Sequence, residues 1–113
     1  MHIPNAQHAV IEPVKLHAYL LSRTHSVGRF KARFFLALGY SAADWPRLEA
    51  DLRTQHLSQD ATLGERTRHG QKYEIRATLV GPSGRSADVV SAWVVRPRED
   101  FPRFVTAYPE GGR

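Results

Sequence analysis

The chain has 113 residues, of which 42% are hydrophobic and 10% aromatic, a composition typical of one globular domain and not of a disordered or fibrous chain. It contains no cysteine, which excludes disulfides, thiol catalysis and zinc sites built on cysteine. Its net charge of +5 indicates an anionic partner or a solvated basic surface. Because no apolar run approaches the roughly 18 residues of a membrane helix, and the N-terminus lacks an export pattern, we expect no membrane contact and a cytoplasmic location.

The first half of the sequence predicts helices. Pro13 suits the first turn of a short amphipathic helix that ends at about residue 22 and has the apolar residues Val14, Leu16, Tyr19, Leu20 and Leu21. Ser26 suits the N-cap of a second helix, residues 27–38, and a third is expected over residues 45–57. The second helix is expected to bury one apolar face and expose one cationic face. These faces contain Val27, Phe30, Phe34, Phe35 and Leu38 on the first, and Arg29, Lys31 and Arg33 on the second.

The second half of the sequence predicts strands. Residues 57–70 are polar and leave room for a short edge strand. From position 71 apolar residues alternate with polar ones, which predicts a strand to residue 80 with one buried face. The Gly-Pro-Ser-Gly sequence at 81–84 predicts a turn, so the next strand, 85–95, returns antiparallel. A last strand is expected over residues 103–108.

This order predicts the fold class. Helices followed by consecutive antiparallel strands are typical of an α+β domain, and no repeat or linker interrupts them. We expect one domain over residues 1–113, with two to three N-terminal helices packed on a three- to four-stranded antiparallel β-meander. The helical part should cover about 13–57 and the β-meander about 61–109.

His25 heads the first group of residues that could carry chemistry. It lies just before the expected start of a helix, where the partial positive charge disfavours the imidazolium and keeps the ring available as a base. Arg29 and Lys31 follow on that helix. Cleavage of RNA by its own 2′-hydroxyl needs a base, a cation for the phosphorane and an acid for the leaving oxygen. The alternative is an ordinary surface histidine followed by a basic helix.

A second group lies on the expected strands. Thr106 and Tyr108 are two residues apart and therefore share one sheet face, where they either orient phosphate and stack on a base or pack as ordinary strand residues. Arg76, Arg85 and Arg103 are expected to bind phosphate if cross-strand pairing gathers them on one face.

The remaining histidines do not predict a metal site. His69 lies in a basic cluster at the entry to the hairpin and is expected either to bind substrate or to remain a solvated loop residue. The six histidines are too scattered for a zinc signature, so we expect no metal and no cofactor. The glycine-rich segment 81–85 lacks the Lys-Ser/Thr ending and the following helix of a nucleotide-binding loop.

Several short stretches together resemble an uncharacterised bacterial domain family that occurs alone and in toxin-like contexts. These stretches are Ile3-Pro4-Asn5-Ala6, Lys15-Leu16, Tyr19-Leu20-Leu21, His25, Gly28-Arg29, Lys31-Ala32, Phe34-Phe35, Gly70, Lys72-Tyr73, Leu79, Gly81-Pro82, Trp93, Pro102-Arg103 and Val105-Thr106-Ala107-Tyr108-Pro109. The order of helices and meander is similar to the barnase, EndoU, colicin and RelE (BECR) group of ribonuclease toxins. That resemblance implies active residues on the sheet and on a preceding helix or loop: His25, Arg29, Lys31, Thr106 and Tyr108. No EndoU-like pair of histidines is present, so no general acid is assigned.

These observations lead to one leading expectation and one alternative. The first is a small toxin that acts as a metal-independent endoribonuclease on RNA, with His25 as base, and that is neutralised by a small acidic antitoxin or immunity protein. The alternative is a non-catalytic basic module that binds nucleic acid or protein within a toxin–antitoxin-like pair.

Overall fold

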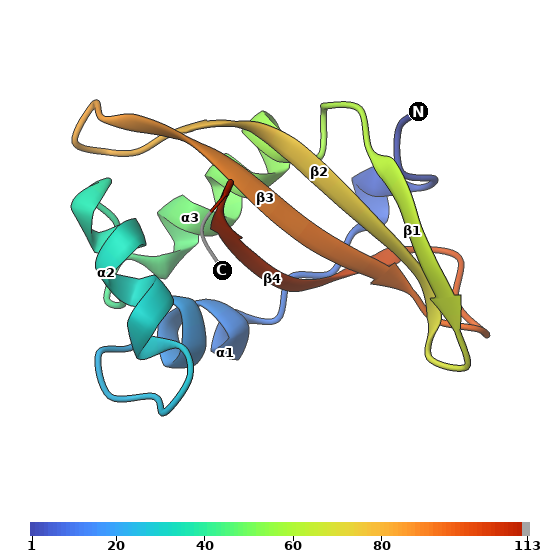
Figure 1. Ribbon diagram of the computed structural model, residues 1–113, viewed down its shortest axis with the longest axis horizontal. Coiled ribbons are helices and arrows are strands. Elements are labelled where there is room, and N and C mark those ends of the chain that lie inside the picture. Colours follow the sequence, from blue (N-terminus) through green and yellow to red (C-terminus); the bar gives the residue numbers. More distant parts are fainter. Residues whose placement is uncertain (112–113) are drawn as a thin grey trace.

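The helical elements come first in the chain, and apart from a short turn near the N-terminus they lie together on one side of the sheet (Figure 1). The computed structural model describes residues 1–111. The elements are a 3-10 turn η1 (Ala6–His8), helix α1 (Pro13–Lys15) with a π-helical turn η2 (Leu16–Leu20), helix α2 (Arg29–Ala37), and helix α3 (Trp45–Asp51) with a second π-helical turn η3 (Leu52–His56). Each of the three predicted helices is therefore present.

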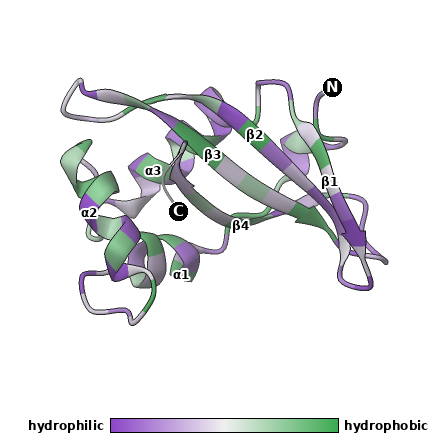
Figure 2. Ribbon diagram, viewed as in Figure 1, coloured by the Kyte–Doolittle hydropathy of each residue, from purple (hydrophilic) through white to green (hydrophobic). Residues whose placement is uncertain are grey.

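Four strands form one antiparallel sheet in the order β1-β2-β3-β4. Their bounds are β1 Thr62–Thr67, β2 Gly70–Val80, β3 Ser86–Val95 and β4 Pro102–Pro109. The α+β class and the meander are confirmed, and the polar segment after η3 provides the edge strand β1. Hydrophilic residues dominate the end of the sheet where β1 turns into β2 (Figure 2). Among residues 1–111, no helix has both the length and the apolar character needed to cross a bilayer.

The core fills the space between the helices and the inner face of the sheet. Ile75 and Leu79, two of the alternating residues of β2, are fully buried, as are Val89 and Trp93 of β3. The register pairs Tyr73 with Trp93 and Ala77 with Val89, so these residues share the inner face. The helical side chains that pack against them include Leu16, Leu20, Leu48 and Leu52.

A polar chain crosses this core. The Trp93 Nε1–H donates to Ser91 Oγ over 2.8 Å, and Ser91 Oγ lies 2.8 Å from His56 Nδ1. His56 Nε2 lies 3.2 Å from the carbonyl oxygen of Ala77. Each group is satisfied if the serine donates to Nδ1 and the imidazole donates from Nε2 to the carbonyl. Burial lowers the pKa of His56 below its usual 6.5, with an opposing contribution from the Ala77 hydrogen bond.

Helix α2 departs from expectation at its start. It begins at Arg29, with Gly28 at the N-cap position, and Ser26 does not cap it. The expectation that this helix buries three phenylalanines is wrong, because Phe35 is buried while Phe30 is 72% exposed. At 100° per residue these two rings lie about 140° apart around the helix, too far to share one buried face.

Candidate functional site

Lys31 connects three elements that are distant in sequence. Its ammonium donates one hydrogen bond to Tyr19 Oη of η2 and another to Thr106 Oγ1 of β4, each over 2.9 Å. The same nitrogen lies 5.2 Å from the centroid of the Tyr19 ring and 5.9 Å from that of Tyr108. Lys31 is half-buried, so this cation is fixed among aromatic rings and still reaches solvent.

The position of Tyr19 depends on the close approach of α2. A Cβ atom at Gly28 would lie 2.1 Å from the carbonyl oxygen of Tyr19, so only glycine allows the two backbones to meet there. Burial raises the pKa of Tyr19, but the hydrogen bonds with Lys31 and Thr106 and the charges of Lys31 and Lys15 outweigh it and bring the pKa below its usual 10.0. The site thus stabilises the phenolate of Tyr19.

Tyr108 extends the candidate site onto the outer face of the sheet. In the ladder Thr106 lies opposite Ala92 and Tyr108 opposite Val90, so both hydroxyl-bearing side chains occupy one face of β4. The Tyr108 hydroxyl donates to Glu74 Oε2 over 3.1 Å. Tyr108, Thr106 and Lys31 therefore form one continuous polar surface.

Arg76 continues this surface. It donates to the other oxygen of Glu74 over 3.1 Å, and it lies 3.7 Å from Glu110. Its guanidinium is thus held between two carboxylates at the edge of the Lys31 group.

His25 joins this group through Tyr19 and not through Lys31. Its ring meets the Tyr19 ring edge-on, with centroids 5.0 Å apart. Nδ1 accepts hydrogen bonds from the backbone N–H groups of Val27 and Gly28, over 3.0 and 2.9 Å. Because both donors are backbone amides, Nδ1 is unprotonated and the ring proton is on Nε2. To act as a base, the ring would have to take a proton at Nδ1 and lose both bonds, so this geometry favours a role in holding this turn and positioning Tyr19 over the expected role of general base.

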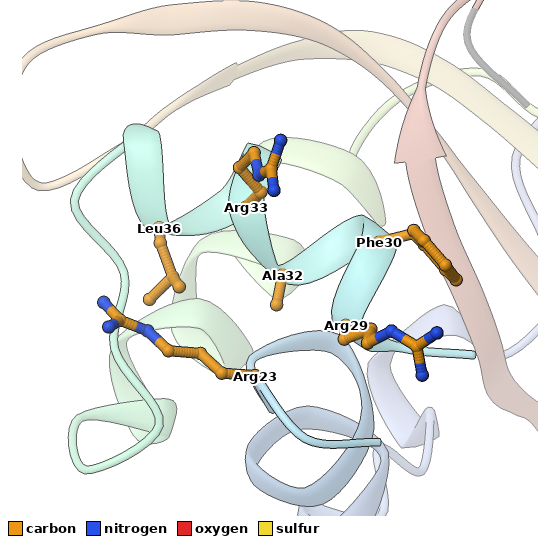
Figure 3. A pocket seen from close by; sticks show the side chains of 6 residues that line it. All are labelled: Arg23, Arg29, Phe30, Ala32, Arg33 and Leu36. Carbon is orange, nitrogen blue, oxygen red and sulfur yellow. The ribbon is translucent and has the colours of Figure 1, made fainter. Parts of the chain in front are cut away.

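Two hollows flank α2 on either side of Phe30. One, of about 800 Å³, is lined by Val27, Phe30, Lys31, Phe34, Glu74, Tyr108 and Pro109. The other, of about 600 Å³, is shown in Figure 3 and is lined by Arg23, Arg29, Phe30, Ala32, Arg33 and Leu36. The first opens directly onto the ammonium of Lys31, and the second is cationic.

The remaining expected site residues lie away from Lys31. Arg103 is engaged by Glu99 over 2.8 and 2.9 Å and lies 3.9 Å from Glu12. Arg85 is exposed beside the β2–β3 turn, and His69 is exposed at the β1–β2 turn. The structure thus brings together His25, Lys31, Thr106, Tyr108 and Arg76, places Arg29 in the hollow on the other side of Phe30, and leaves the other three apart.

Tyr19 is the site residue that sequence reasoning missed. In the sequence it is one more apolar member of the first helix, and the only signal was a phenol at the edge of that helical face. Among residues 1–111, no three His, Asp or Glu side chains gather in a way that could hold a metal ion.

Comparison with known proteins gives a fold relative and a family. A chain in the contact-dependent growth inhibition toxin–immunity protein complex from Klebsiella pneumoniae 342 is similar with a TM-score of 0.57 and 17% identity, over 88% of this chain and 98% of that chain. At this identity the likeness concerns the fold alone. No protein with a curated description matches the sequence. Residues 2–111 match the model of a family described as a domain of unknown function, DUF6883, and the chain therefore belongs to that family.

Proposed function

We propose that this protein is a small toxin that cuts RNA as a metal-independent endoribonuclease. The observation that carries the proposal is the contact of the Lys31 ammonium with Tyr19 and Thr106 at the mouth of an open groove. A fixed cation beside an acidified phenol is suited to transfer of a proton and to stabilisation of a phosphorane. The fold shared with a chain of a toxin–immunity complex supports the toxin class, and the resemblance to the BECR ribonuclease toxins supports RNA as substrate.

The proposed reaction uses Tyr19 and Lys31 as a proton-transfer pair. The ribose 2′-oxygen attacks the adjacent phosphorus and, as the O2′–P bond forms, gives its proton to Tyr19 in its ionised form, which Lys31 favours by lowering the pKa of the phenol. The P–O5′ bond breaks, and the 5′-oxygen takes a proton from Lys31. The products are a 2′,3′-cyclic phosphate and a 5′-hydroxyl end. Return of the proton from Tyr19 to Lys31 across their 2.9 Å hydrogen bond then restores both groups.

The neighbouring residues have supporting roles in this proposal. Thr106 holds the ammonium in place, and Tyr108 orients the phosphate or stacks on a base. His25 holds the turn before α2 and packs against the Tyr19 ring, and its Nε2–H remains as a donor to phosphate. Arg29 binds phosphate near the groove, where it has no ion pair within the described part of the chain.

The test is cleavage of a single-stranded RNA oligonucleotide by purified protein in EDTA, with analysis of the product ends. We expect Lys31→Gln and Tyr19→Phe to lower the rate at least about 100-fold, and Thr106→Val to lower it less. Arg98→Gln, which removes an exposed charge from the β3–β4 connection, is the matched control. Full activity in Lys31→Gln would contradict the catalytic role of Lys31, and activity that needs an added divalent ion would contradict a metal-independent mechanism.

A protein inhibitor is part of the proposal. A toxin of this class must be blocked in the cell that makes it, and the basic surface around α2 suits a small acidic immunity protein. The similar structure is a complex of a toxin with an immunity protein, so the second candidate is the neutralising, non-catalytic half of such a pair. Expression of this chain alone decides between them, because a toxin slows bacterial growth and an immunity protein does not.

A further inference from the structure

Phe30 is placed where it contributes little to the fold. It is 72% exposed, and its neighbour Val27 is 55% exposed. The guanidinium carbon of Arg29 lies 4.5 Å from the centroid of the Phe30 ring. A ring that is held against a cation and presented to solvent is arranged to contact something outside the chain.

The arginines beside Phe30 have no anionic partner in the described residues. Arg23, Arg29 and Arg33 form none of the ion pairs of residues 1–111, unlike Arg47, Arg53, Arg76 and Arg103, which pair with carboxylates. Arg66, Arg68, Arg85, Arg96 and Arg98 also lie outside those ion pairs, so what distinguishes the first three is that they line one hollow together. Figure 3 shows the three guanidinium groups spread around the cationic hollow next to α2. This hollow therefore has the charge to receive phosphate groups.

The groove on the other side of Phe30 has the opposite chemistry. Its walls are mainly apolar, with Val27, Phe34 and Pro109 beside the Phe30 and Tyr108 rings. Its volume of about 800 Å³ exceeds that of a nucleobase, and Lys31 lies in its wall. A base that enters the groove would thus have an aromatic ring to stack on and a cation next to its ribose and phosphate.

We propose that the outer face of α2 binds one nucleotide of single-stranded RNA, with its base on Phe30 in the groove and a flanking phosphate on Arg29 and Arg33. This inference rests on the proposed function and specifies its substrate class. Stacking on one ring requires an unpaired base, and the arginine fork suits phosphate. The subsite tolerates different bases, because every base presents an aromatic face.

The stacking part is tested by fluorescence anisotropy with a labelled single-stranded 2′-O-methyl oligonucleotide, which lacks the attacking hydroxyl. We expect Phe30→Ala to weaken binding about tenfold, within the range for loss of one stacked base. Phe30→Trp should bind at least as tightly as the natural protein, and Phe30→Leu should be weakened, because it keeps apolar bulk without the ring. The same sequence as a duplex should bind more weakly.

The phosphate part is tested by the salt dependence of the same binding. Each phosphate contact to a single strand contributes about 0.7 to the slope of log affinity against log salt, so Arg29→Gln with Arg33→Gln, which removes the contact with the one flanking phosphate, should lower that slope by about 0.7. The control, Arg96→Gln with Arg98→Gln, removes the same charge from the β3–β4 connection, at the far end of the sheet from α2 (Figure 1). A greater change in this control than in the α2 pair would overturn the subsite.

The outcomes separate the subsite from the cleavage activity. Binding that depends on Phe30 and the two arginines, without cleavage of unmodified RNA, supports the subsite and rejects the ribonuclease. Cleavage with unchanged affinity in Phe30→Ala and in the arginine pair rejects the subsite and keeps the ribonuclease. In that case a protein partner is the occupant of this face.

Discussion

The hydrogen-bonded side chains around His56 in the core and those around Lys31 at the candidate site are both polar, but they differ in their exposure to solvent. His56 and Ser91 are fully buried and each of their polar atoms has an internal partner. Lys31 and Tyr19 are half-buried, and Lys31 lines an open groove. Burial keeps the imidazole neutral by lowering its pKa, whereas a fixed cation lowers the pKa of the phenol. A shifted pKa therefore indicates a catalytic group only where a substrate can reach that group.

Removal of the core imidazole should produce the largest change in stability. His56→Ala leaves a cavity and deprives the Ser91 hydroxyl and the Ala77 carbonyl of their partner, so we expect a loss of about 3 kcal/mol in the free energy of unfolding. Urea denaturation measures it. The folded fraction should still cleave RNA, since the core chain does not touch the groove. A loss below about 1 kcal/mol would show that the Ser91 hydroxyl and the Ala77 carbonyl are not left without hydrogen-bond partners in the variant.

Acid should reduce the contribution of the buried His56 to the stability of the fold. Because the folded pKa of His56 lies below the unfolded value of 6.5, the unfolded state binds the proton first. The contribution to stability is complete above pH 6.5 and is lost as the pH falls from there toward the folded pKa, by at most about 1.4 kcal/mol per pH unit. Urea midpoints measured between pH 7.5 and 5 should fall in the natural protein and change less in His56→Gln. Equal slopes would contradict this assignment.

The smallest expected effect concerns His25, the histidine at the site. His25→Ala removes the acceptor for two backbone amides at the start of α2, and we expect a loss of about 1 kcal/mol in stability with a partial loss of cleavage. His25→Asn can accept the same hydrogen bonds and should restore most of both. If His25 is instead the general base, both variants are inactive at every pH and Asn rescues stability alone.

The fold was predictable because its signals are local. Alternation from position 71 identified the buried face of β2, and the turn at 81–84 fixed the antiparallel return. The start of α2 was misplaced because Ser26 is a good cap by residue type, whereas the helix has Gly28 at the N-cap position and no side-chain cap hydrogen bond. The ring of His25 instead accepts hydrogen bonds from Val27 and Gly28 in the turn before the helix.

The site was predictable only in part because its contacts are not local. Lys31 and Thr106 are separated by 75 positions in the chain, and their pairing follows from how β4 packs beside α2, which spacing alone does not reveal. Tyr19 was classed as apolar because its ring fits the helical period. Phe30 was expected in the core because a hydrophobic residue on an amphipathic helix is usually buried.

Because Phe30 and Lys31 are adjacent in α2, a small inhibitor can cover both of them. Helix α2 has nine residues, a rod of about 14 Å at 1.5 Å per residue, and on the proposed function it carries both the contact with RNA and the reacting cation. An inhibitor need not fill the whole groove: a short acidic segment laid along this one rod would block binding and cleavage together.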